Sequence, residues 1–174
     1  AMAFDLAHDP GWRVQGQWAF GQPEGQGGER GAPDPTQGAT GENVYGYNLA
    51  GDYDNGLRST SYLTTLPLDC SSLGDVELVF QRWLGVESAD DATIQVSNNG
   101  KQWHEVWANG SSSLADASWR EVRYDISEIA SHQPTVYVRW GLGPTNRTQR
   151  RCGWNIDDVA LWAVVHPDAA GRLL

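Results

Sequence analysis

Two adjacent aspartates near the C-terminus, Asp157 and Asp158, lie at the centre of an apolar segment and are the residues best placed to do chemistry. Residues 152–162 alternate as a β-strand does, with successive side chains on opposite faces. Whichever face is buried therefore carries a carboxylate with it. A buried carboxylate must be hydrogen-bonded, paired or bound to a cation, since burial without a partner is costly. The pattern predicts a cation site before it predicts a catalytic one.

Calcium is the cation that such residues suit best, because it takes about six to eight oxygen ligands from carboxylates, amides and backbone carbonyls. Other aspartates lie on the opening strand, in a long glycine-rich loop and in the oxygen-rich turn at 51–56. The predicted structural calcium site draws on these acids: Asp5, Asp34, Asp52, Asp157 and Asp158. If the first and last strands lie close together, Asp5 would come near the Asp157–Asp158 strand.

An alternative without metal remains open for the same acids. Asp52 and Asp54 could form an Asx turn, in which the side chain accepts a hydrogen bond from its own backbone. One aspartate of the 157–158 pair could instead pair with Arg139 or Arg151.

A second candidate site follows from the alternation in residues 136–140. This pattern turns Val136, Val138 and Trp140 inward and leaves Tyr137 and Arg139 outward. Other polar donors on central strands would join them, and the predicted ligand-binding set is Arg82, Gln95, Tyr137 and Arg139. Two guanidinium groups, an amide and a phenol suit a ligand with hydroxyl or carboxylate groups. The alternative is a pair of surface arginines that balance nearby acids.

The aromatic residues divide into two groups. Strand patterns place one group in the core, namely Trp18, Trp103, Trp140 and Trp162. If the arginine-bearing face is not the site, the loop aromatics Tyr45, Tyr47 and Trp119 are the next candidates for contact with a ligand.

Catalytic interpretations find little support. The four histidines, His8, His104, His132 and His166, form no metal pair and do not neighbour a candidate nucleophile. Adjacent residues of a regular strand point opposite ways, so Asp157 and Asp158 cannot flank a glycosidic bond as an acid–base pair. We therefore expect a domain that is not an enzyme.

The charge and hydropathy of the sequence limit the classes of molecule that it can bind. The 174 residues include 22 acidic and 12 basic side chains, for a formal net charge of −10. Nucleic acid and anionic membrane are therefore excluded as partners, because phosphate binding needs a basic face. No apolar run approaches the roughly 20 residues of a membrane span, so membrane insertion is not expected.

The two cysteines, Cys70 and Cys152, lack the spacing of a zinc site. We predict that they form a disulfide, which would imply an oxidising compartment. Two buried free thiols are the alternative.

Short segments of strand character recur along the chain, separated by turn residues. After an opening pair of strands within 3–20, an irregular loop rich in glycine and proline occupies 21–42, and strand character resumes at 44–49. Further strands are expected near 60–68, 75–86, 92–98, 103–107, 119–126, 134–142 and 154–165. Asn99-Gly100 predicts a hairpin with a type I′ turn. This spacing indicates an all-β sandwich or barrel, with one module over 3–165 and a tail at 166–174.

Four blocks resemble the MAM-like jelly-roll modules that are appended to secreted bacterial proteins, notably metalloproteases of the immune-inhibitor type. The blocks are GQWAFG at 16–21, VYGYNLAGDY at 44–53, ATIQVSNNGKQW at 92–103 and GWNIDDV at 153–159. The last block is also similar to carbohydrate-binding jelly rolls, whose final strand can carry Asn-Ile-Asp with the aspartate on calcium.

The resemblance implies an antiparallel two-sheet jelly roll with a non-catalytic role and often a structural calcium ion. We expect a monomeric accessory module, covalently part of a larger secreted or cell-surface protein. Carbohydrate is the leading ligand class. A protein-interaction or spacer role in a secreted metalloprotease is the second interpretation, and an enzyme domain is the third.

Overall fold

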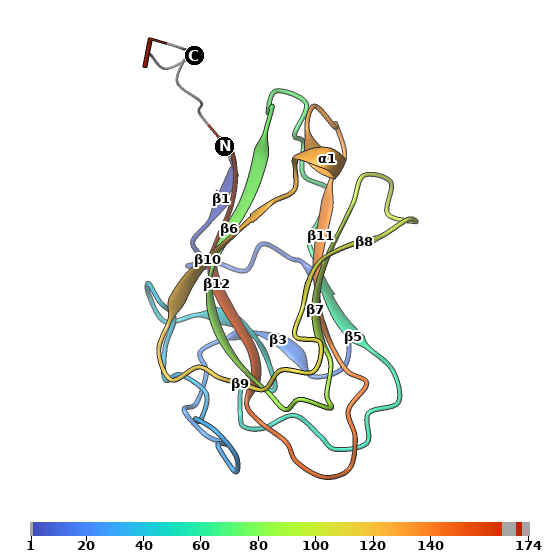
Figure 1. Cartoon of the computed structure of the whole chain (residues 1–174). Helices are drawn as coiled ribbons and strands as arrows, with labels where there is room; N and C mark the ends of the chain where they lie inside the picture. The colour runs from blue at the N-terminus through green and yellow to red at the C-terminus, as the bar shows by residue number, and fades with distance from the viewer. Residues whose placement is uncertain (1, 165–169, 172–174) are drawn as a thin grey trace.

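Two antiparallel sheets face each other across the core of the computed structural model, which describes residues 2–164 and 170–171 (Figure 1). Sheet A runs in the order β10 (Arg120–Asp125), β6 (Val76–Val86), β12 (Gly153–Ala163), β4 (Val44–Tyr47) and β3 (Trp18–Gly21). Two short strands extend it: β1 (Met2–Phe4) pairs with β12, and β9 (Leu114–Ala115) pairs with β6. Sheet B runs β2 (Arg13–Val14), β5 (Ser61–Thr64), β11 (Tyr137–Leu142), β7 (Ala92–Ser97) and β8 (His104–Ala108). One helical turn, α1 (Ser127–Ala130), follows β10. The predicted all-β jelly-roll sandwich is confirmed.

The core forms because each central strand turns every second side chain inward. On β6, Leu78, Phe80 and Leu84 are fully buried, and on β11 Val138 and Trp140 are fully buried. These side chains meet between the sheets and join one hydrophobic cluster.

An aromatic stack ties the two sheets together. The ring of Trp12 lies 5.2 Å from that of Tyr45 at an interplanar angle of 7°, and 5.9 Å from that of Trp140 at 13°. Such ring pairs contribute about 0.5–1.5 kcal/mol beyond area burial. Tyr45 and Tyr47, named above as possible ligand contacts, are 1% and 2% exposed, so they belong to the core.

Strand β12 changes its neighbour part of the way along its length. It pairs with β4 at Asn155 and Ile156, and with β1 at Val159, Ala160 and Leu161. Between these stretches the register against β6 shifts, and Asp158 takes a left-handed φ of 48°. The predicted proximity of first and last strands is confirmed, and a β-bulge sits at the Asp157–Asp158 pair.

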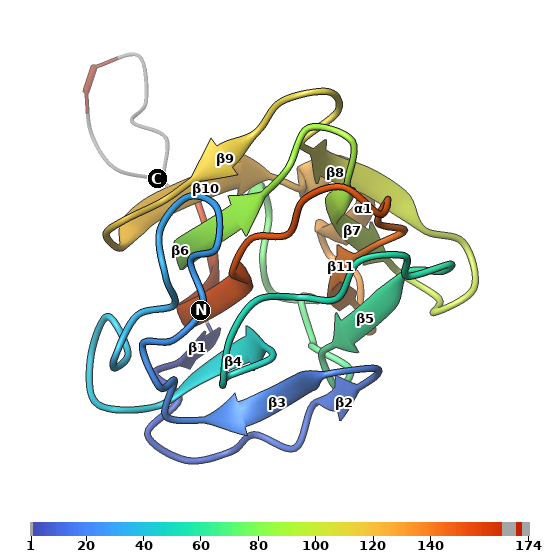
Figure 2. The same cartoon turned by 90° about the horizontal axis from the view of Figure 1, so that it is seen from below.

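The loop that joins β3 to β4 is fixed against the outer face of sheet A. In Figure 2 it runs beside β6 and β1 before it returns to β4. The indole of Trp83 donates to the carbonyl of Pro33 (3.1 Å), and the Asn155 amide donates to Asp34 (2.8 Å). Trp154 and Ile156 belong to the core, so Asn155 and Asp157 lie on the opposite face, beneath this loop.

The β7–β8 hairpin forms as predicted, but its turn is longer than a type I′ turn. Asn99 has no positive φ, whereas Gly100 has a φ of 72°. The Asn99 side chain instead accepts hydrogen bonds from the backbone N–H groups of Lys101 (2.8 Å) and Gln102 (2.9 Å). The predicted tail at 166–174 falls, apart from 170–171, outside the described residues.

The predicted Cys70–Cys152 disulfide is wrong, because both thiols are free and buried. The Cys70 N–H donates to the carbonyl of Gln133, just before β11 begins. Cys152 precedes Gly153, which lies against Leu142 at the end of β11. A six-residue strand is about 20 Å long, whereas a disulfide needs Cα atoms within about 7 Å.

Candidate functional site

The outer face of sheet B gathers polar and aromatic side chains around Arg139. This residue lies opposite Gln95 of β7 and opposite Thr64 of β5, so it occupies the middle of the sheet. Its Nε donates to Oε1 of Gln95 at 2.7 Å. Across an antiparallel pair, directly opposite side chains lie close enough to interact, and here the register makes that contact.

Two aromatic rings enclose the Arg139 guanidinium. Its Cζ atom lies 3.7 Å from the ring centroid of Tyr62 and 3.9 Å from that of Trp103. Cation–π contacts of this kind contribute about 0.5–2 kcal/mol each, depending on exposure. The partial burial lowers the pKa of the Arg139 guanidinium.

A glycine makes room for this arrangement. Gly141 lies opposite Tyr62 and Thr93, and a Cβ there would come within 2.9 Å of Tyr62 Cε1 and 2.6 Å of Thr93 Oγ1. Tyr137 completes the group, with its ring 6.4 Å from that of Trp103. We call Tyr62, Gln95, Trp103, Tyr137 and Arg139 the arginine face.

Three of the four predicted ligand residues thus come together, but the prediction for Arg82 is wrong. Arg82 lies in sheet A opposite Ile156, and it points inward between Phe80 and Leu84. It is 6% exposed and makes a two-point ion pair with Asp116, with Nε–Oδ2 at 2.9 Å and Nη2–Oδ1 at 3.2 Å. Arg82 is therefore a buried structural residue on the other sheet.

Tyr62 and Trp103 were not among the predicted ligand residues. Trp103 was expected in the core, but it sits in the β7–β8 turn just before β8 begins, and it folds over the outer face. The alternation in β5 could have identified Tyr62, since Leu63 is fully buried and its neighbours must face the other way.

The two strand aspartates reach the same residue of the long loop. Asp157 Oδ2 accepts from the Thr40 N–H (3.1 Å), and Asp158 Oδ1 accepts from the Thr40 hydroxyl (2.6 Å). The regular strand predicted from the sequence would have directed them apart, so the bulge at Asp158 brings them together. Among the described residues, neither carboxylate forms an ion pair with Arg139 or Arg151.

Asp157 also contributes to a cradle of oxygen atoms at Gly38. A Cβ on Gly38 would lie 2.6 Å from Asp157 Oδ2, 2.6 Å from the Thr40 carbonyl oxygen and 2.8 Å from the Asn43 carbonyl oxygen. Burial raises the Asp157 pKa to about 6, although backbone hydrogen bonds from Thr40 and Asp158 oppose this shift. One carboxylate and two carbonyls in a small space are three oxygens of the kind that calcium takes, out of the roughly six to eight that it needs.

Asp34 occupies a different environment. It is 2% exposed, its Oδ1 accepts from Asn155, and its Oδ2 has no hydrogen-bond partner among the described residues. Burial raises the Asp34 pKa to about 8; the Asn155 hydrogen bond opposes the shift and the charge of Asp52 adds to it. Asp34 and Asn155 form a buried polar anchor for the long loop.

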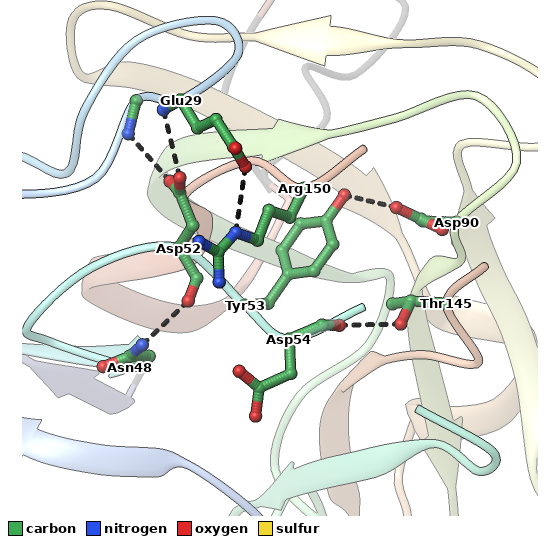
Figure 3. Close-up of polar contacts among 9 residues, drawn as sticks. Glu29, Asn48, Asp52, Tyr53, Asp54, Asp90, Thr145 and Arg150 are labelled. Atoms are coloured by element: carbon green, nitrogen blue, oxygen red, sulfur yellow. Dashed lines mark hydrogen bonds and ion pairs between the residues drawn. The ribbon is translucent and has the colours of Figure 1, made fainter. Parts of the chain in front are cut away.

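Asp52 anchors the long loop from the other side. Figure 3 shows its carboxylate accepting from the backbone N–H groups of Gly28 (2.8 Å) and Glu29 (3.0 Å), while Arg150 pairs with Glu29 (2.9 Å). Its neighbour Tyr53 donates to Asp90 at 2.6 Å. The alternative of an Asx turn does not describe Asp52 either, since the partners of its carboxylate lie more than twenty positions away.

The five predicted metal ligands therefore do not share one site. Asp5 accepts from the Ala7 N–H, Asp34 and Asp52 anchor the loop, and only Asp157 and Asp158 converge. Over residues 2–164 and 170–171, no group of three or more histidine, cysteine, aspartate or glutamate side chains could hold a metal. A cation at the cradle would depend on backbone carbonyls as well.

A curated relative shows where such a domain occurs. The chain is 29% identical over 157 residues to Bacillopeptidase F of Bacillus subtilis (strain 168). The match covers 87% of this chain but only 10% of the relative, so the chain spans about a tenth of that protein's length. No protein-family model matches the chain.

Solved structures with the same sandwich include binding domains. The K2 cleaved adhesin domain of Lys-gingipain has a TM-score of 0.55 at 15% identity, covering 94% of this chain and 99% of that one. The CBM22-2 xylan-binding domain of Paenibacillus barcinonensis Xyn10C has a TM-score of 0.54 at 12% identity, and the match covers 94% of this chain and 99% of that domain. A CBM35 domain from Paenibacillus barcinonensis has a TM-score of 0.52 at 14% identity, and the match covers 94% of this chain and 100% of that domain. At these identities the likeness establishes the jelly-roll fold. Within the described residues, no helix is long and apolar enough to cross a membrane.

Proposed function

We propose that this chain is a non-catalytic carbohydrate-binding module and that the arginine face is its binding surface. The observation that carries the proposal is the arrangement of Arg139 between Tyr62 and Trp103. With Nε committed to Gln95, the two terminal nitrogens of the guanidinium are held in one orientation beside aromatic rings. Aromatic surfaces with a few oriented polar groups are the usual make-up of a small-ligand site.

The chemistry of this face suits a sugar. A guanidinium donates to hydroxyl groups and pairs with carboxylates at two points, and the Gln95 amide and Tyr137 hydroxyl add further donors and acceptors. The similar structures of a CBM22 xylan-binding domain and a CBM35 domain support this ligand class.

The chain's place in a larger secreted or cell-surface protein belongs to the same proposal. Support comes from the Bacillopeptidase F match, which covers one part of a much longer chain, and from the cleaved adhesin domain of Lys-gingipain. A monomeric state stays a prediction.

Calcium at the Gly38 cradle is a further part of the proposal. Asp157, through its side chain, and Thr40 and Asn43, through their carbonyls, would hold the ion. Calcium would supply the positive charge that a buried Asp157 carboxylate otherwise lacks, and it would fix the long loop to β12.

The proposal is tested with a glycan array on the purified domain, followed by calorimetry on the glycans that bind. Arg139→Ala should weaken binding at least tenfold in a domain that stays folded, although the loss of its two cation–π contacts should lower the melting temperature by several degrees. Arg139→Lys should weaken it similarly, because an ammonium group cannot reproduce the stacked, planar guanidinium. Arg58→Ala, which removes an exposed arginine elsewhere, is the matched control. Intact binding in Arg139→Ala would place the site on another surface.

A protein-interaction or spacer role is the second candidate, favoured by the adhesin and protease matches. It predicts no glycan binding on the array. In that case, capture of a protein partner that Arg139→Ala abolishes would assign the arginine face to protein recognition.

A further inference from the structure

A groove separates the two sheets along their free edges, and it shares one lining residue, Trp103, with the arginine face. It has a volume of about 700 Å³ and lies between β8, the last strand of sheet B, and β10, the last strand of sheet A. Four aliphatic residues, Val96, Val106, Ile126 and Ile129, line it among polar and charged side chains. A groove of this kind can take the apolar side chains of a ligand.

The backbone of β10 offers hydrogen-bonding groups along its free edge, next to the groove. The Ile126 N–H donates to the Val76 carbonyl at 3.0 Å, and along an antiparallel pair such bonded positions alternate with positions that point away. By this alternation the N–H and C=O groups of Glu121 and Arg123 face away from β6. Since β10 ends the order of its sheet, a strand added there would find these groups available.

The rim of the groove is acidic. Glu105 and Glu128 are exposed on opposite sides, and Asp125 lies between them. The lining cation Arg123 is already paired with Glu77 at 2.8 Å and with Glu121. A partner segment would therefore gain from carrying positive charge.

We propose that this groove binds an extended, basic segment of a partner protein by strand addition to β10. Alternate residues of that segment would place apolar side chains against the aliphatic lining and Lys or Arg side chains at the acidic rim. Pairing over the six residues of β10 gives the segment a length of about 20 Å. A second copy of this chain is disfavoured as the occupant, because each copy carries a formal charge of −10. This inference is independent of glycan binding.

The probe is a fluorescent eight-residue peptide of alternating Lys and Val, titrated against the domain at about 0.1 M salt. A peptide of alternating Glu and Val tests charge, and we expect it to bind at least tenfold more weakly. A Lys–Val peptide with an N-methyl group on every residue, which blocks both of its edges, tests strand pairing. This peptide should also bind at least tenfold more weakly, because it cannot form the backbone ladder with β10. The test needs no change in the protein.

The location is tested with Glu105→Lys/Glu128→Lys, which reverses the charge of the rim, against the control Glu24→Lys/Glu42→Lys. Both control sites are exposed and lie in the long loop, and the total change of charge is the same. The rim variant should bind the Lys–Val peptide at least tenfold more weakly than the parent. The affinity of the control should stay within about twofold of the parent's. Equal losses in both variants, or unchanged binding of the N-methylated peptide, would overturn the proposal. Dimerisation of the domain that the Lys–Val peptide does not reverse would also overturn it, since a second copy would then fill the groove.

Discussion

Replacing Asp34 by asparagine should remove a pH dependence of stability on the alkaline side of neutrality. Asp34 is 2% exposed and its pKa is raised from 3.8 to about 8. The folded state therefore holds a proton that the unfolded state releases, so stability falls as pH rises through the interval between the two pKa values. Above about pH 8 the Asp34 carboxyl is charged in both the folded and the unfolded state, and the loss of stability is complete.

The size of the effect follows from the two pKa values. Between pH 6.5 and 9 the free energy of unfolding should fall by about 2 kcal/mol, at about 1.4 kcal/mol for each pH unit below 8. For a domain of this size that is a drop of about 4–8 °C in melting temperature. The free energy of unfolding of Asp34→Asn should be nearly constant over the same interval, because an amide does not titrate there.

The assay is urea unfolding followed by tryptophan fluorescence at pH 6.5, 7.5, 8.5 and 9, in chelator. Asp157→Asn is the matched control: the pKa of Asp157 is about 6, so its titration lies largely below this interval and the fall should persist. If the free energy of unfolding of Asp34→Asn falls with pH as much as that of the parent, the reasoning is refuted.

Three more outcomes are expected. Calcium should raise the melting temperature of the parent by several degrees near pH 7.5 but leave Gly38→Ala unchanged, because a Cβ would lie 2.6 Å from two of the proposed ligand oxygens; equal shifts would argue against the cradle. Thiol titration of the denatured, unreduced protein should find both Cys70 and Cys152 free, and an absence of titratable thiol would contradict the structure. Asp116→Ala should destabilise by about 3–5 kcal/mol, measured by urea unfolding, because it leaves the Arg82 guanidinium charged and buried; Arg82→Met/Asp116→Ala should recover part of that loss.

Strand content was predictable because it depends on local patterns. The long strand expected at 75–86 appears as Val76–Val86, and that at 92–98 appears as Ala92–Ser97. Period-two alternation and turn residues carry this information within each segment. Pairing order does not have a local signal, and this is why Arg82 was assigned to the wrong sheet.

The candidate site was predictable only in part, for the same reason. Gln95, Tyr137 and Arg139 were found because β7 and β11 both alternate clearly. Trp103 was misplaced because a residue just outside a strand is not bound by the alternation of that strand. Asp157 and Asp158 were expected on opposite faces, and the bulge that unites them depends on the change of partner from β4 to β1, which no local pattern reports.

The two anchors that hold the β3–β4 loop at Asp34 and Asp157 call for opposite solution conditions. Asp34 is favoured as a neutral acid, whereas Asp157 would be favoured as a charged group beside a cation. With the proposed calcium bound, alkaline pH would loosen one half of the loop, and acid or chelation would loosen the other. In hydrogen exchange the Asp34 amide, bonded to Gln26, and the Thr40 amide, bonded to Asp157, would then report separate local opening free energies with opposite pH trends. Complete release of the loop would then require both of these anchors and the Asp52 anchor to open at once.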